Sequence, residues 1–268
     1  MIRVIGVGDN TVDKYLHIRL MFPGGNAVNV SVLAHRYGHK ASYIGWLGDD
    51  VAGRLVLAAL QEEGVDTSRC RVFPGPNATS EVTSVEGERV FGRSNPGVSR
   101  HIALDEADFA FIGRHDVTHS SIYSHLGNQL SSLSRASNRL SFDFSDLRDW
   151  AYLKTALPLI DIAFLSSPAG KPSQTVDLAR WAQAQGPSVV VATQGKEGAL
   201  AYDGKALVRQ AIMPTTVLDT LGAGDAFAAR FLVEHLSGAS LEQAMAAAAM
   251  SAAETCTYLG AFGHGVPF

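Results

Sequence analysis

The fold of this chain is indicated most clearly by Asp219-Thr220-Leu221-Gly222-Ala223-Gly224-Asp225-Ala226-Phe227, which an alanine-rich helical pattern follows at once. Two glycines at the start of a helix let main-chain N–H groups converge on an anion with no Cβ in the way. The carboxylate of Asp225 follows directly, so an anion cradle adjoins a proton acceptor. This pairing is typical of a site that moves a phosphoryl group onto a hydroxyl. The alternative interpretation is an ordinary glycine turn that caps a helix.

Two further glycine-containing stretches precede this one, Gly24-Gly25-Asn26-Ala27-Val28-Asn29 and Gly45-Trp46-Leu47-Gly48-Asp49-Asp50-Val51-Ala52-Gly53. In this order and at this spacing, the three stretches resemble the signatures of the ribokinase-like (PfkB) carbohydrate kinases. The resemblance covers essentially all 268 residues. It implies an α/β fold, a ribokinase-like three-layer sandwich with a mostly parallel central sheet and a small β lid, in a single kinase domain spanning residues 1–268.

Composition excludes several classes of protein. A hydrophobic content of 46% with 18% charged residues excludes a disordered chain. A net charge of −4 gives no support for nucleic-acid binding. The apolar run 244–253 is too short to cross a membrane, and the first residues read as a strand rather than a signal peptide. With only two distant cysteines, Cys70 and Cys256, we expect a cytoplasmic protein.

Strand-like and helical patterns alternate along most of the chain, which predicts βαβ units and a parallel sheet covered on both faces. Strands are expected at 3–8, 41–47, 116–119, 140–144, 161–165 and 188–193, and the first two helices at 26–37 and 51–63. The region 69–92 breaks the alternation with short strands joined by turn residues. By resemblance, residues of about 11–22 and 69–98 form a lid over the active site, and such lids meet in a homodimer. A plain edge hairpin is the alternative.

The catalytic roles follow from the opening stretch. Asp225 is the candidate base for the attacking hydroxyl, and the N–H groups of Gly222, Ala223 and Gly224 are the candidate donors to the transferred group. The family resemblance assigns the same roles to these positions. Thr220 is a candidate for the nucleotide side or for a helix cap.

Residues near the amino terminus suit a sugar site. Gly24 and Gly25 allow close approach of the backbone to a polyol, and Asn29 offers a donor and an acceptor from inside a helix, where Asn is a mediocre choice. Asp9 follows the first strand and is either a sugar ligand or a turn former, while Asp13 matches the family residue that grips sugar hydroxyls. Asn26 is as readily a helix cap as a site residue. His119 and His125 are candidates to line the sugar site or to be structural.

The nucleotide side is expected at the loop after the strand at 188–193. Thr193, Gly195 and Gly198 resemble the family's nucleotide loop, although a hairpin turn explains them equally. A dinucleotide fingerprint and a P-loop are absent from the sequence. The resemblance implies ATP and Mg²⁺ as cofactors and leaves a monovalent cation open. Many family members carry Asn-x-x-Glu where this chain reads Ser166-Ser167-Pro168-Ala169, so the metal ligands are unassigned.

The substrate is narrowed by three further segments, Gly8-Asp9-Asn10, Phe142-Asp143-Phe144-Ser145-Asp146 and Gly260-Ala261-Phe262-Gly263. They resemble the branch of the family that phosphorylates fructose joined to an amino acid. We therefore expect ATP-dependent phosphorylation of such a substrate at its 6-hydroxyl, with Arg89 or Arg93 reading the carboxylate. The alternatives are a kinase for another sugar or a nucleoside, and a non-catalytic sugar-binding protein on the same fold.

Overall fold

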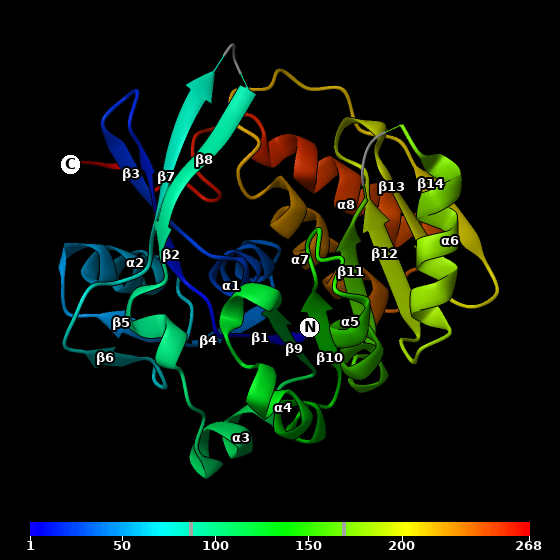
Figure 1. Cartoon of the computed structure of the whole chain (residues 1–268), viewed down its shortest axis with the longest axis horizontal. Helices are drawn as coiled ribbons and strands as arrows, with labels where there is room; N and C mark the ends of the chain where they lie inside the picture. The colour runs from blue at the N-terminus through cyan, green and yellow to red at the C-terminus, as the bar shows by residue number, and fades with distance from the viewer. Residues whose placement is uncertain (86–87, 168–169) are drawn as a thin grey trace.

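The computed structural model describes residues 1–85, 88–167 and 170–268, and its centre is one sheet of eight strands (Figure 1). In spatial order the strands are β14 (Leu207–Gln210), β13 (Ala199–Tyr202), β12 (Val189–Thr193), β11 (Ile162–Ser166), β10 (Leu140–Asp143), β9 (Val117–Ser121), β1 (Arg3–Val7) and β4 (Lys40–Ile44). The six strands from β12 to β4 are parallel. At one edge β13 pairs antiparallel with β12, and β14 pairs antiparallel with β13. The predicted mostly parallel sheet is confirmed.

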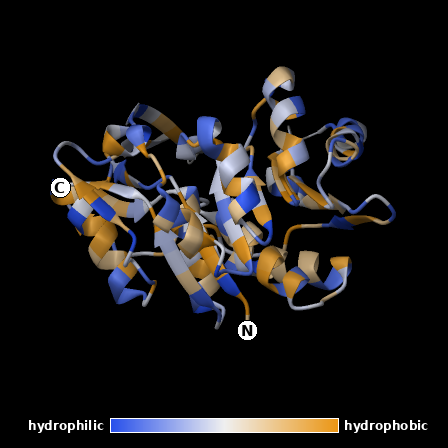
Figure 2. Cartoon of the chain, turned by 90° about the horizontal axis from the view of Figure 1, so that it is seen from below, coloured by the Kyte–Doolittle hydropathy of each residue, from blue (hydrophilic) through white to orange (hydrophobic). Residues whose placement is uncertain are grey.

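Helices cover both faces of the sheet, which gives three layers. One face carries α1 (Asn26–Arg36), α7 (Ala223–Leu236) and α8 (Leu241–Thr255), and the other carries α3 (Glu106–Ile112), α4 (Leu130–Ala136), α5 (Trp150–Ala156) and α6 (Pro172–Gln183). Side chains of one strand serve both layers in turn, as in β1, where Val4 and Ile5 enter opposite cores. Hydrophobic and hydrophilic segments alternate along the helices in Figure 2, as expected for helices with one face on a sheet.

A second sheet lies beside the central one, and its β7–β8 hairpin projects away from the body of the molecule (Figure 1). Its order is β15 (Val266–Pro267), β3 (Leu20–Gly24), β2 (Thr11–Tyr15), β7 (Thr79–Val85) and β8 (Glu88–Asn95). Tyr15, Phe22 and Val82 of this sheet pack with Leu221, which belongs to the loop before α7. The second sheet therefore rests on the stretch that opened the sequence analysis.

Several predicted elements are confirmed and others are corrected. The predicted helix at 51–63 is α2 (Val51–Glu62), which starts where the Asp50 side chain accepts the N–H of Gly53 at 2.9 Å. The strand predicted at 41–47 is wrong, because it divides into β4 and β5 (Trp46–Gly48) around Gly45. Strand β5 leaves the central sheet and pairs with β6 (Arg71–Phe73), which was expected in the hairpin of the lid.

Short 3₁₀ turns complete the description: η1 (Gly97–His101), η2 (Ile122–Ser124), η3 (Gly127–Gln129), η4 (Leu157–Leu159) and η5 (Gly195–Glu197). Within the described ranges, no helix has both the length and the apolar character that a membrane crossing requires.

The sheet order fixes where a ligand site is expected. Strands β1 and β9 are neighbours, but the chain leaves β1 towards β4 on one side and leaves β9 towards β10 on the other. The connections that follow the two strands therefore diverge and leave a crevice at their carboxyl ends. Open α/β sheets bind ligands at such a switch point.

Candidate active site

Asp9 lies at the mouth of this crevice and holds the first turn of α1 in place. Its carboxylate accepts the backbone N–H of Asn26 at 2.6 Å and the hydroxyls of Ser121 and Ser124 at 2.8 Å each. Anions are favourable at a helix N-terminus, where backbone N–H groups lack partners within the helix. The structure thus occupies the oxygens of Asp9, an expected sugar ligand, with protein donors that orient α1.

Asp225 lies across the crevice in the first turn of α7, and two amides from α1 reach its carboxylate. Asn26 Nδ2 donates to Oδ1 at 2.8 Å, and Asn29 Nδ2 donates to Oδ2 at 2.5 Å. One donor on each oxygen fixes the plane of the carboxylate. A carboxylate has about four lone-pair positions, so it retains room to accept a further proton donor.

The surroundings of Asp225 suit a group that exchanges a proton near neutral pH. Burial raises the pKa of the Asp225 carboxyl to about 7, the hydrogen bond from Asn29 opposes this rise, and the charge of Asp143 adds to it. A general base works best when its pKa lies near the pH of the reaction.

Asp143 is a second acidic side chain at this place, contributed by the carboxyl end of β10. Its Oδ2 accepts from Asn26 Nδ2 at 3.0 Å, and its Oδ1 accepts the N–H of Ser145 at 2.7 Å. Burial raises the pKa of Asp143 to about 6. Sequence analysis did not predict the contact of this residue with α1, because nothing in its neighbourhood shows that the two meet.

Asn26 occupies a different place from the helix cap that was considered for it. Gly25 is the residue at the N-cap, and Asn26 is the first residue of α1, with its side chain turned to the two carboxylates. The interpretation of Asn26 as a cap is therefore wrong.

A small cradle lies next to Asn29 and is formed by three elements. A Cβ built on Gly24 of β3 would lie 2.9 Å from Asp13 Oδ2 of β2 and 3.6 Å from Asn29 Oδ1 of α1, so a side chain at position 24 would fill it. Asn29 is 4% exposed, and its Oδ1 has no hydrogen-bond partner within the described residues. A buried acceptor without a donor is costly. The cradle therefore suits a ligand that brings hydroxyl groups, as the sequence predicted for these three residues.

The start of α7 presents backbone donors beside Asp225. Gly222 has φ 77°, and a Cβ there would lie 2.4 Å from the Cβ of Ala261, so the turn requires glycine. The N–H of Ala223 reaches the carbonyl of Thr220 at 3.3 Å, which makes it a weaker candidate donor than expected. Gly224 is exposed, and its N–H lies in the first turn of α7, where backbone N–H groups have no partner within the helix.

Asp219 supports this turn from below, a role that sequence analysis missed. Its carboxylate accepts the N–H of Leu221 at 3.0 Å and the N–H of Gly260 at 2.9 Å. It also accepts the hydroxyl of Tyr15, which belongs to the second sheet. Asp219 therefore joins the loop before α7 to the C-terminal turn and to the second sheet.

The residues expected to bind the nucleotide lie after β12. Thr193 ends the strand, Gly195 is exposed at φ 56°, and a Cβ on Gly198 would lie 2.1 Å from the carbonyl oxygen of Gln210. The side chain of Gln194 is buried and donates to Thr175 Oγ1 at 2.9 Å. Packing explains Gly198, and the part of this loop in nucleotide binding stays a prediction, as it does for the exposed Thr220.

Two other predicted sites, the arginines of the lid and the position of the Asn-x-x-Glu motif, include residues that the structure does not describe. Arg93 is exposed on β8, where its backbone N–H reaches Glu81 Oε2 at 3.4 Å, whereas the side chain of Arg89 lies outside the described residues. Residues 168–169, at the expected Asn-x-x-Glu position, also lie outside them. Within the described parts of the chain, no cluster of three or more His, Cys, Asp or Glu side chains fits a metal ion.

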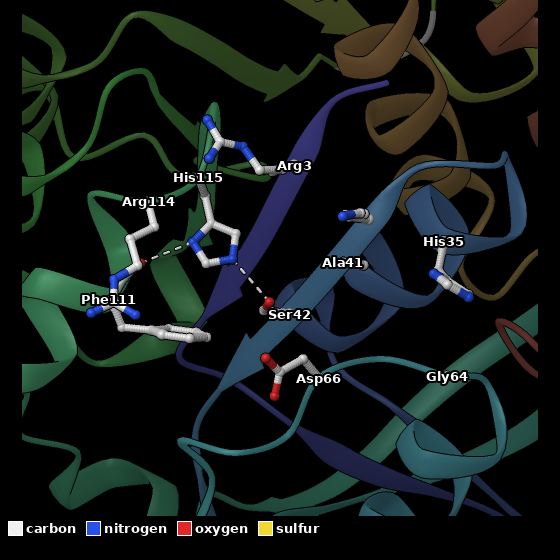
Figure 3. A pocket seen from close by; sticks show the side chains of 10 residues that line it. Arg3, His35, Ala41, Ser42, Gly64, Asp66, Phe111, Arg114 and His115 are labelled. Atoms are coloured by element: carbon white, nitrogen blue, oxygen red, sulfur yellow. Dashed lines mark hydrogen bonds between the residues drawn. The ribbon is translucent and has the colours of Figure 1, made fainter.

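A separate hollow has a volume of about 340 Å³. Figure 3 shows Arg3, Ser42 and His115 among the side chains that line it. His115 lies between Ser42 Oγ at 2.9 Å and the carbonyl of Phe111 at 3.0 Å, and Arg3 is paired with Asp116. Arg3 and Lys40 start their strands, so this hollow lies at the amino ends of β1 and β4. Ligand sites of open α/β sheets lie at the other end. We therefore take the Asp225 crevice, and not this hollow, as the candidate active site.

Comparison with known proteins gives matches over nearly the whole chain. Residues 1–264 match the description "pfkB family carbohydrate kinase". The chain is 41% identical over 270 residues to the fructosamine kinase FrlD of Bacillus subtilis (strain 168), covering 99% of this chain and 95% of that one. It is 39% identical over 256 residues to a fructoselysine 6-kinase of Shigella flexneri, covering 96% and 98%. Its fold is similar to that of Arabidopsis thaliana ribokinase complexed with ribose and ATP, with a TM-score of 0.83 at 20% identity, covering 98% and 94%.

Proposed function

Because the chain belongs to the pfkB family of carbohydrate kinases, we propose that it transfers the terminal phosphoryl group of ATP to the 6-hydroxyl of a fructose–amino acid conjugate such as fructoselysine. Relatives with fructosamine kinase and fructoselysine 6-kinase names, about 40% identical over nearly the full chain, support this substrate class. The observation that carries the chemistry is the Asp225 carboxylate, held by two amides beside a buried acceptor to which no described residue donates.

In this proposal the sugar lies in the cradle of Asp13, Gly24 and Asn29. A sugar hydroxyl donates to Asn29 Oδ1 and so satisfies an acceptor that the described part of the chain leaves without a donor. The close approach that Gly24 permits brings the ring against the backbone of β3. The attacking hydroxyl then lies near Asp225, whose other hydrogen bonds already fix its orientation.

The proposed transfer exchanges one phosphorus–oxygen bond for another. The sugar oxygen forms a bond to the terminal phosphorus as the bond from that phosphorus to the bridging oxygen of ADP breaks. The hydroxyl proton passes to the carboxylate of Asp225. Backbone N–H groups in the first turn of α7, including that of Gly224, face the transferred group and favour its negative charge. Positioning and charge stabilisation supply most of the catalysis in such a reaction.

The second sheet acts in this proposal as the lid, and Arg93 of β8 reads the carboxylate of the amino-acid part. The planar guanidinium group can donate two parallel hydrogen bonds to a carboxylate. Arg93 is exposed in the described structure and so is accessible to a substrate that enters beneath the sheet. Exposed apolar side chains of the same lid, Leu16 and Ile18 in the turn between β2 and β3 and Val90 on β8, support the homodimer expected from the sequence.

A substrate panel tests the proposed function. We expect ATP-dependent ADP release with fructoselysine and related conjugates, and a lower kcat/KM with fructose, ribose or adenosine. A decarboxylated conjugate tests Arg93, because Arg93→Ala should abolish the preference for the carboxylate form. Assays with K⁺ and with Na⁺ address the monovalent cation. ADP release with fructose or ribose alone would identify a kinase for another sugar, and binding of sugar without ADP release would identify a non-catalytic protein.

A further inference from the structure

A buried histidine lies behind the active site in a contact that the proposed chemistry does not use. His119 of β9 is fully buried. Its Nδ1 lies 2.9 Å from Ser141 Oγ of β10, and its Nε2 lies 2.8 Å from Asn26 Oδ1 of α1. Burial lowers the pKa of His119 to about 3, so the ring is neutral at any pH at which the protein works.

These contacts select one tautomer of His119 and one orientation of the Asn26 amide. The amide nitrogen of Asn26 contacts two carboxylates, so its oxygen must point to His119. An amide oxygen only accepts, and therefore His119 Nε2 carries the hydrogen while Nδ1 accepts from the Ser141 hydroxyl. If the amide turned over, its oxygen would face two carboxylates and its nitrogen would face an N–H group.

The orientation of the Asn26 amide has a consequence for the two acidic residues. One N–H of Asn26 donates to Asp225 Oδ1 and the other donates to Asp143 Oδ2. The two carboxylates therefore meet at a single nitrogen, although they come from α7 and β10. Neighbouring carboxylates repel when both are ionised, and a shared donor favours their ionised forms.

We propose that Asn26, held by His119, is a positioning residue for phosphoryl transfer, and that it couples Asp225 to Asp143 so that Asp143 helps to set when Asp225 is ionised. This inference rests on the proposed function of Asp225 as the base. Three other titratable groups lie close to the pair. The charge of Asp9, in the β1–β2 connection, raises the pKa of both carboxyls, Tyr123 lies near Asp143, and His119 contacts Asn26.

The proposal makes opposite predictions for the two partners of Asn26. Asp143→Asn removes a negative charge next to Asp225, so the acid limb of the kcat/KM profile should move to lower pH. Asn26→Ala removes an N–H that favours ionised Asp225, so the acid limb should move to higher pH. We expect each displacement to be on the order of one pH unit, or about tenfold in kcat/KM at a pH below the limb.

The histidine is tested by a rescue. His119→Leu leaves the Asn26 amide free to turn over, so the acid limb should move to higher pH as it does in Asn26→Ala. His119→Gln restores an amide N–H directed at Asn26 Oδ1 and should return the profile towards that of the wild type. His115→Leu is the matched control, because His115 is also a buried histidine bonded to a serine, but it lies at the opposite end of the sheet. Its profile should stay unchanged.

A second measurement separates this proposal from the proposed function. The carboxyl ¹³C resonance of Asp225, assigned with Asp225→Asn, reports its ionisation in the free protein without turnover. It should titrate at lower pH in Asp143→Asn and at higher pH in Asn26→Ala. If neither the kinetic limb nor the resonance moves, the coupling is wrong even though the kinase function stands. If the resonance moves but no sugar is phosphorylated, the coupling survives and the proposed function fails.

Discussion

Asp225 owes its surroundings to two asparagines that lie three residues apart on α1. Residues at this spacing share one side of a helix, so Asn26 and Asn29 reach the same carboxylate. Asparagine is an unfavourable residue inside a helix, because its side chain competes for backbone hydrogen bonds. Here both side chains donate across the crevice to α7 instead. The unfavourable helix propensity is explained by the site and not by the helix.

Replacing Asp225 by Asn tests the base directly. The amide keeps the shape of the side chain but cannot accept the hydroxyl proton, so kcat should fall by roughly 10²–10⁴-fold, the usual contribution of a general base. Steady-state kinetics give kcat, and calorimetric titration should show ATP binding nearly intact. A variant that retains more than half of the wild-type kcat would remove Asp225 from the mechanism.

Among single residues, the sequence predicted those site candidates that a short stretch of sequence indicates by itself. Asp225 was predicted from its glycine neighbours, and Asn29 from its position inside a helix. The contacts of His119 and Asp143 with Asn26 were not predicted, because they join residues 93 and 117 positions apart. No short pattern records such contacts, since they depend on which strands become neighbours in the sheet.

The two glycines at the start of α7 have different roles, one in the fold and one in the proposed site. Gly222 and Gly224 both precede Asp225, yet only Gly222 has a positive φ and lies against Ala261. Gly224 lies inside the helix, where a Cβ would meet nothing within 4 Å. One glycine therefore serves the fold, and the other leaves the first turn open to a ligand.

The two glycines form a matched pair of variants. Gly222→Ala should lower the free energy of unfolding by about 1–3 kcal/mol, because alanine is strained at positive φ and its Cβ would strike Ala261. Gly224→Ala should leave the stability unchanged or slightly higher, because alanine is the better helix former. Denaturant titration measures both values. The expectation is contradicted if Gly224→Ala proves the more destabilising of the two.

Element boundaries were predicted well where the pattern was regular. The helix at 51–63 and the central strands were predicted within a few residues of the observed bounds. The break at Gly45 was not, because the run 41–47 is mostly apolar on both sides of this glycine and its departure from the sheet depends on pairing with β6. Strand β15 was also missed, since two residues carry no periodicity.

For the whole molecule, the crevice links activity to stability. The folded state raises the pKa of Asp225 to about 7 and that of Asp143 to about 6, whereas an unfolded aspartate has a pKa of about 4. Between these values the folded protein holds protons that the unfolded chain releases. Stability is therefore fully present below about pH 4 for this pair, and it falls as the pH rises through 6 and 7.

Asp225→Asn should remove part of this loss of stability at high pH. We expect the variant to be more stable than the wild type by about 1–3 kcal/mol at pH 8, where the wild-type carboxylate is ionised and partly buried. At pH 5 the advantage should be small, because the wild-type carboxyl is then protonated. Unfolding in urea at the two pH values gives the comparison. An advantage that does not change with pH would mean that the buried charge is not its cause.

The hydrogen bond from Tyr15 to Asp219 links the second sheet to the loop before α7, so that the two are expected to move together. Leu221 extends the joint, because it packs beneath the sheet with Tyr15, Phe22 and Val82. If the sheet swings over a sugar, the loop proposed to face the phosphate must move with it or lose a buried hydroxyl–carboxylate hydrogen bond. Closure of the sheet on the sugar then moves the loop proposed to bind the phosphate of ATP. This linkage would make the binding of sugar and ATP cooperative and favour one order of substrate addition.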